Sequence, residues 1–229
     1  MKMEEMILNY TSQQNELRKR ISLKNNFSTD QIKLVAGVDI AYWGENNKEY
    51  GACCIQVIDF NSKKIIEQIE YINEITIPYI SGFLAFRELP LVLEAVKKVR
   101  TNPDLYMFDG NGYLHSRHMG IATHASFFLE KPTIGVAKTY YKIENTDFIM
   151  PENIAGAFTD IVIDGVVYGR ALRSRKDVKP IFVSCGNEID LDTATNITMH
   201  FIEKDSRLPI PTRYADLATH QARKLQRDY

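Results

Sequence analysis

The chain has 229 residues, a formal net charge of −1, 45% hydrophobic residues and three cysteines. Its length and apolar content suffice for one well-packed domain. The near-zero charge excludes a protein that coats nucleic acid through overall charge, although it permits a local basic groove. The cysteines, two of them adjacent, form neither a disulfide framework nor a metal-binding motif.

The N-terminal region is charged and predicts a helix over residues 3–24 that ends in a basic cluster. It lacks the apolar core of a secretory signal, and no apolar run in the sequence approaches the length of a membrane span. We therefore expect a cytoplasmic protein with a single domain over residues 1–229. We also expect a monomer with no membrane partner.

Three strands are predicted in the first part of the chain. The first is Leu34–Trp43, an apolar run that contains Asp39, and the next two are Tyr50–Phe60 and Lys64–Ile72. Because short turns join them, they predict an antiparallel meander. After a loop over residues 77–82, helical spacing predicts a helix over Phe83–Arg100, which Pro90 should kink or restart.

The remainder of the chain alternates strands and helices, and it contains no repeat or linker. A buried strand at Leu105–Asp109 leads to a helix, and a second buried strand leads to Lys138. The predicted elements after Asp109 are a helix at Met119–Leu129, a strand at Pro132–Ala137, a hairpin at Ala157–Ile163 and Val166–Arg173, a strand at Ile181–Cys185, and helices at Ile189–Glu203 and Pro211–Arg223.

This order predicts an α/β fold with a ribonuclease H-like mixed β-sheet, in which three antiparallel strands precede parallel strands and helices flank the sheet. In that arrangement the first strand lies beside the fourth and parallel to it. Asp39 and Asp109 would then be neighbours at the carboxyl ends of the strands, where open α/β sheets bind ligands.

The acids Asp39, Glu88 and Asp109 come from three different elements. If they converge, their oxygens form a site suited to Mg²⁺ or Mn²⁺. Two such ions about 3.5–4 Å apart clamp the attacking and leaving oxygens of a phosphodiester. Each acid also has a structural interpretation: Asp39 as a paired buried acid, Glu88 as a first-turn helix residue, and Asp109 as a turn cap.

Three further features have two interpretations each. Lys138 either extends to solvent from a strand end or points at the same crevice, where it contacts a phosphate or positions a water. The basic segment at residues 170–179 is either a solvated loop or a surface for the phosphate backbone. Tyr79 is either a core residue or an aromatic wedge that fills the gap left by a flipped base.

Taken together, these residues resemble the endonuclease V family, deoxyinosine-directed nucleases of the ribonuclease H-like superfamily. The resemblance rests on GVDIAY (37–42), PYISGFLAFRE (78–88), PDLYMFDGNGYLHSRHMGIATH (103–124), PTIGVAK (132–138) and PTRYAD (211–216). These segments extend over most of the chain, in order and with tight spacing.

The resemblance assigns roles to particular residues. Asp39 and Asp109 correspond to metal ligands, Glu88 to the third catalytic acid, and Lys138 to the active-site lysine. Asp216 matches a position where some members place a further acid or a histidine near the metal. The residues implied in substrate binding are Tyr79 as the wedge and, around the flipped hypoxanthine, Gly82, Gly110, Gly112, His115 and Ile121. His124 also matches a position near the substrate, without a defined role.

The resemblance implies Mg²⁺-dependent cleavage, with Mn²⁺ as a substitute, of single- or double-stranded DNA that contains deoxyinosine. The cut falls at the second phosphodiester 3′ to the lesion and leaves a 3′-hydroxyl and a 5′-phosphate. The sequence departs from the commoner pattern at Ser81, Asn111 and Ser116, which affects details of base preference. Two alternatives stay open: an inosine-specific endoribonuclease, and a protein that binds deaminated nucleic acid without cutting it.

Overall fold

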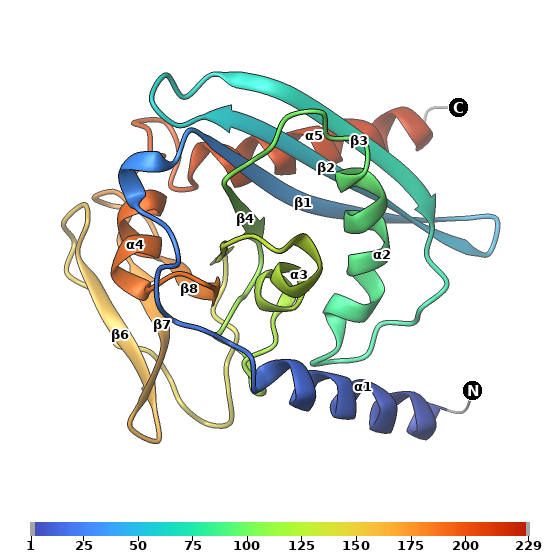
Figure 1. The fold of residues 1–229 in the computed structure, drawn as a ribbon, viewed down its shortest axis with the longest axis horizontal. Helices are drawn as coiled ribbons and strands as arrows, with labels where there is room; N and C mark the ends of the chain where they lie inside the picture. The colour runs from blue at the N-terminus through green and yellow to red at the C-terminus, as the bar shows by residue number, and fades with distance from the viewer. Residues whose placement is uncertain (1–2, 228–229) are drawn as a thin grey trace.

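The chain folds around one mixed sheet, and the computed structural model describes residues 3–227 (Figure 1). Across the sheet the strands follow the order β3-β2-β1-β4-β5-β8-β7-β6. Their bounds are β1 Leu34–Glu45, β2 Lys48–Asp59, β3 Ile65–Glu74, β4 Leu105–Asp109, β5 Thr133–Ala137, β6 Phe158–Ile163, β7 Val166–Leu172 and β8 Ile181–Asn187. The predicted fold class is confirmed.

Helices cover both faces of this sheet. Within the described residues they are α1 Met3–Arg18, a short 3-10 helix Thr29–Gln31, α2 Leu84–Val96, α3 Ile121–Leu129, α4 Leu191–His200 and α5 Ile210–Arg227. In Figure 1, α1 runs along the lower edge of the molecule, beneath α2 and α3. None of the helices in residues 3–227 has both the length and the apolar character needed to cross a membrane.

The central pairing of the sheet is parallel. Strand β1 pairs with β4 from Val35 opposite Leu105 to Val38 opposite Phe108. Asp39 and Asp109 are therefore the next residues on the two strands, at the same edge of the sheet. This confirms the prediction that the first strand lies beside the fourth and parallel to it.

Each face of the sheet has its own apolar core. On one face, Val35 and Met107 pack with Ile210 of α5 and with residues of α4. On the other face, Val38 packs with Leu89 of α2 and with residues of α3. Because side chains alternate along a strand, Asp39 projects on the α5 side of β1 and Tyr42 projects on the α2 side.

Several elements differ from the predictions. The helix expected over residues 3–24 ends at Arg18, and the chain then crosses to β8, where Ser22 N donates to Asn187 Oδ1 at 2.8 Å. Helix α2 is shorter than expected and continues through Pro90 without restarting. The side chain of Pro90 is exposed, so its ring lies on the solvent side of α2. A proline inside a helix removes one backbone hydrogen bond.

The later strands extend the sheet in antiparallel orientation. Strand β8 pairs antiparallel with β5, and the predicted hairpin of β6 and β7 continues outward from β8. The parallel part is thus limited to the neighbours of β4. The strand pattern in the sequence predicts that these elements exist but carries no information on their orientation.

Candidate active site

Three carboxylates meet where β4 ends. Asp39 lies on β1, Asp109 is the last residue of β4, and Asp216 lies on α5. One oxygen atom of each lies within 4.8 Å of the corresponding oxygens of the other two. Clustered carboxylate oxygens are ligands that Mg²⁺ and Mn²⁺ prefer, so these three residues could hold a divalent cation.

A lysine lies between two of these acids. The Nζ atom of Lys138, which follows β5, is 2.6 Å from Asp109 Oδ2 and 2.6 Å from Asp216 Oδ1. Burial disfavours the charged amine, but the two hydrogen bonds outweigh it and raise the pKa of Lys138. The side chain therefore stays a cation that partly neutralises the acidic cluster.

The electrostatics of the cluster fit a divalent cation. Burial, and then the adjacent Asp109 carboxylate, raise the pKa of Asp39 to about 7. Burial likewise raises the pKa of Asp109, and the hydrogen bond from Lys138 partly offsets the effect. Thr219 Oγ1 donates to Asp39 Oδ2 at 2.8 Å and orients that carboxylate. A bound cation would stabilise the ionised acids, which the protein alone does only in part.

Glu88 lies outside this three-residue cluster. It projects from α2, is buried, and accepts a hydrogen bond from the Tyr42 hydroxyl on β1. Burial, aided by the charges of Asp39 and Asp109 and opposed by the Tyr42 hydrogen bond, raises the pKa of Glu88 to about 8. Glu88 is thus electrostatically coupled to both aspartates, although it reaches the site from the opposite face of the sheet.

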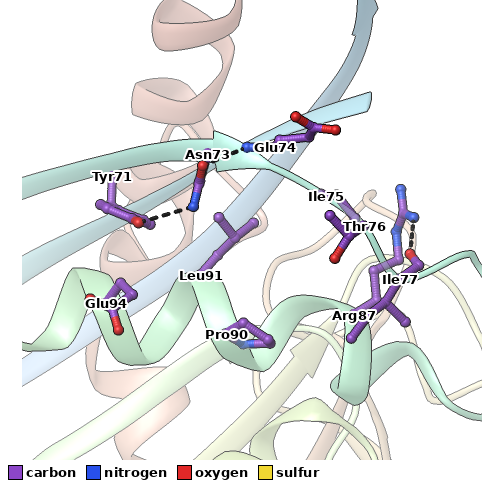
Figure 2. A pocket seen from close by; sticks show the side chains of 10 residues that line it. All are labelled: Tyr71, Asn73, Glu74, Ile75, Thr76, Ile77, Arg87, Pro90, Leu91 and Glu94. Carbon is purple, nitrogen blue, oxygen red and sulfur yellow. Dashed lines mark hydrogen bonds between the residues drawn. The ribbon is translucent and has the colours of Figure 1, made fainter. Parts of the chain in front are cut away.

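Arg87 connects the neighbourhood of Glu88 to the loop before α2. Figure 2 shows its guanidinium beside Ile77, whose carbonyl accepts from Nη1 at 2.7 Å, in the lining of a cavity of about 90 Å³. The same guanidinium forms an ion pair with Glu49 and lies over the ring of Tyr42, 4.8 Å from its centroid. None of the candidate catalytic acids lines this cavity, and Arg87 anchors the loop there.

A second cavity, of about 140 Å³, is lined by residues that lie close in sequence to Asp109 and Glu88. Its volume suits one small ring system, because drug-sized ligands need roughly 300 Å³ or more. Gly110 follows Asp109 directly and lines this cavity, as does Ala85, one helical turn before Glu88. Five of the six predicted substrate-binding residues line it: Tyr79, Gly82, Gly110, His115 and Ile121.

The sixth, Gly112, lies outside the cavity lining and packs against β8. A Cβ atom at Gly112 would lie 2.1 Å from the carbonyl oxygen of Cys185, so only glycine allows this approach. Its amide N donates to Ser184 Oγ at 2.9 Å. Gly110, in contrast, has a φ of +154°, and a Cβ there would lie 2.8 Å from Ile121 Cγ2.

The two histidines have different surroundings. His115 lines the cavity, its ring stacks on Tyr141, and its Nδ1 accepts from the backbone N of Arg117 at 3.2 Å. His124 is buried in α3, edge-on to Phe86. Burial lowers the pKa of each histidine to about 4, so both are neutral near pH 7. Neither can bind a phosphate as a cation.

For the two leading arginines of residues 170–179, the structure fits neither interpretation, the solvated loop or the phosphate-binding surface. Arg170 is buried and forms ion pairs with Asp160 at 2.9 Å and Asp192 at 2.7 Å. Arg173 donates to backbone carbonyls, including that of Pro151 at 3.1 Å. Both guanidinium groups therefore hold the β6–β7 region together and are not available to nucleic acid.

Sequence reasoning missed two residues that orient the acids. Tyr42 ends the GVDIAY segment and hydrogen-bonds Glu88, and Thr219 hydrogen-bonds Asp39. Thr219 follows Asp216 by one helical turn, so helical spacing places both on one face of α5. That spacing was a usable signal, whereas the Tyr42 contact depends on how α2 docks on the sheet.

A mixed sheet with parallel central strands, helices on both faces and clustered acids at the carboxyl edge defines the ribonuclease H-like class. The model of one family in that class, described as Endonuclease V, matches residues 15–217. The chain therefore belongs to the Endonuclease V family, which is a family of nucleases.

Individual relatives support membership of this family. The chain is 62% identical to Endonuclease V of Bacillus thuringiensis subsp. konkukian over 96% of this chain and 93% of the relative. The Endonuclease V structure from Bacillus subtilis superposes with a TM-score of 0.94 at 57% identity, covering 100% of this chain and 96% of that one.

A more distant structure contains bound DNA. Ciona intestinalis Endonuclease V superposes with a TM-score of 0.83 at 28% identity, covering 96% of this chain and 98% of that one. It is in complex with a 24mer DNA containing an inosine followed by a ribo-adenosine.

Proposed function

We propose that the chain is a Mg²⁺-dependent endonuclease that recognises deoxyinosine in DNA and hydrolyses the second phosphodiester 3′ to it. The cut leaves a 3′-hydroxyl and a 5′-phosphate, and Mn²⁺ substitutes for Mg²⁺. The observation that carries the proposal is that Asp109, a member of the acidic cluster, is followed directly by Gly110, which lines the 140 Å³ cavity. The inosine-containing DNA held by the Ciona relative supports it.

In this proposal Asp39, Asp109 and Asp216 hold the cation. When bound, the ion would stabilise negative charge on the phosphodiester and lower the pKa of a water nucleophile. Lys138 keeps a positive charge beside two of the acids and presents it to the phosphate. Glu88, oriented by Tyr42, acts as the third catalytic acid, either on the ion or on one of its waters.

The cavity is proposed to take the hypoxanthine base after it leaves the helix stack. Its glycine-lined walls let backbone groups approach a flat ring. A mispaired or unpaired inosine costs less to extrude than a base in a sound pair, so extrusion itself contributes to selectivity. Tyr79, whose side chain is 66% exposed at the mouth of the cavity, is proposed to fill the vacated position in the stack.

An inosine-specific endoribonuclease is the second candidate. The observation that favours it is the ribo-adenosine that follows the inosine in the strand bound by the Ciona relative. A family member thus accommodates a 2′-hydroxyl next to the lesion, the group that distinguishes RNA from DNA.

Cleavage of matched strands tests the proposal. Single strands of DNA and RNA with one inosine at the same position are incubated with Mg²⁺, with Mn²⁺, or with a chelator. We expect faster cutting of DNA with either ion, no cutting with the chelator, and a product ending one nucleotide 3′ to inosine. Equal or faster cutting of RNA would favour the second candidate. Binding of the strands without any cutting would contradict the proposal that the protein is an endonuclease.

The wedge role of Tyr79 gives a separate prediction. Tyr79→Ala should lower the preference for inosine DNA over intact duplex by about tenfold or more, because base–aromatic stacking contributes roughly 1–3 kcal/mol. Mn²⁺ affinity, measured by titration, should not change. Tyr79→Phe should retain the preference, and so should Phe128→Ala, which removes an aromatic side chain exposed on α3. An unchanged preference in Tyr79→Ala would argue against the wedge.

A further inference from the structure

A buried contact joins α1 to the rim of the base cavity. Gln14 is 0% exposed, although it lies on a helix at the edge of the molecule. Its Nε2 donates to the carbonyl oxygen of Gly82 at 3.2 Å, and its Oε1 accepts from Arg117 Nε at 2.5 Å. Arg117 Nη2 donates to the same Gly82 carbonyl at 2.7 Å. We call this closed set of hydrogen bonds the Gly82 clamp.

The clamped residue has an unusual backbone. Gly82 has a φ of +79°, in the left-handed region that favours glycine, and it lines the base cavity three residues after Tyr79. Loops that line binding sites are commonly among the less stable parts of a protein, so contacts from outside the loop decide how well this one is held. The two donors of the clamp supply those contacts, one from α1 and one from the segment between β4 and α3.

Aromatic packing surrounds the clamp. The guanidinium of Arg117 lies 4.2 Å from the centroid of the Phe83 ring. Tyr10 of α1 stacks on Phe86 of α2, with ring centroids 3.9 Å apart. Gln14 is fully buried, whereas Gly82 and Arg117 are partly exposed. Leaving the Gln14 amide unpaired would therefore be costly, and the three groups hold one another in a single arrangement.

We propose that Gln14, together with Arg117, is a positioning residue for base recognition. It fixes the Gly82 carbonyl and thereby the cavity rim and the loop that carries Tyr79. The inference rests on the proposed function, since the ligand of the cavity is taken to be a base. The hydrogen bonds of Gln14 go to Gly82 and Arg117 and not to the acidic cluster, so it acts on recognition and not on hydrolysis.

Three variants test this role. Gln14→Leu removes both of its hydrogen bonds at similar volume. Gln14→Glu keeps an acceptor for Arg117 but loses the donor to Gly82. Gln13→Leu is the matched control, since the neighbouring Gln13 is exposed and bonds only Asn9 Oδ1 among the described residues, at 3.1 Å.

Steady-state cleavage of the inosine strand is the first readout. Both Gln14 variants should raise KM about five- to tenfold, the loss expected for one or two buried hydrogen bonds, with kcat and Mn²⁺ affinity little changed. The folded fraction of Gln14→Glu at the assay temperature should stay near that of the wild type, which separates positioning from folding. A fall in kcat without a rise in KM, or the same KM rise in Gln13→Leu, would overturn the proposal.

Amide hydrogen exchange of residues 79–83 is the second readout and needs no substrate. Both Gln14 variants should exchange faster in this segment than the wild type and Gln13→Leu. If the wild type fails to cut inosine strands but the exchange difference is present, the proposed function is wrong and the clamp stands. Unchanged exchange in both Gln14 variants would refute the clamp, whatever the activity.

Discussion

Replacing Asp109 by alanine is expected to slow single-turnover cleavage of an inosine strand by on the order of 10³-fold or more. A bound metal ion contributes several kcal/mol of transition-state stabilisation, and about 1.4 kcal/mol corresponds to a factor of ten in rate. Asp109 supplies one oxygen of the three-residue cluster and one of the two partners of Lys138. Its loss therefore affects both the proposed metal site and the lysine.

Binding of the inosine strand should persist in Asp109→Ala, because other residues line the base cavity. Fluorescence anisotropy in the absence of cleavage measures this. The control is Asp147→Ala, which removes an acid whose side chain is 76% exposed and which pairs with Lys142. Cleavage at the wild-type rate by Asp109→Ala would refute the metal role of this residue.

Replacing Gly37 by alanine is expected to destabilise the protein by about 1–3 kcal/mol or more, the usual range for overpacking a core. A Cβ at this position would lie 2.0 Å from the carbonyl oxygen of Pro211 at the start of α5, a backbone atom that no rotamer change can move away. Either β1 or α5 must shift. Since α5 carries Asp216 and Thr219, the shift should also disturb the acidic cluster.

Denaturant unfolding measures the loss of stability in Gly37→Ala, and cleavage assays measure the disturbance of the acidic cluster. Gly37→Ala should lose more cleavage than inosine binding, because the cavity lies on the other side of the sheet, against α2 and α3. Gly44→Ala is the matched control on the same strand, since its Cβ would have only one neighbour within 4 Å, Lys48 O at 3.8 Å. Wild-type stability and rate in Gly37→Ala would show that α5 does not depend on this close approach.

The central strands of the sheet could be predicted from the sequence because short apolar runs mark them. The apolar run before Asp109 predicts a buried strand, and the order of elements predicts that β1 lies beside it. The sequence therefore predicts that Asp39 and Asp109 are neighbours, and the register of β1 with β4 confirms it. The residues that line the cavity were predicted from the resemblance to the family. Gly112 lies outside that lining, because it packs against β8 and needs to be glycine for that reason.

Contacts between distant segments could not be predicted in the same way. Arg170 looks like a phosphate ligand in the sequence because the acids that pair with it, Asp160 and Asp192, lie on other elements. Gln14 is one of several polar residues in a charged helix, and only the docking of α1 buries it against Gly82. Such roles depend on tertiary packing, which residue type and local spacing do not encode.

The central claim is that Asp39, Asp109 and Asp216 jointly bind a divalent ion. A crystal structure of the protein soaked in Mn²⁺, with anomalous data, tests it most directly. We expect an anomalous peak contacted by oxygens of Asp39, Asp109 and Asp216, with Lys138 Nζ displaced from its position between Asp109 and Asp216. A peak elsewhere, or none at Mn²⁺ concentrations that support cleavage, would contradict it.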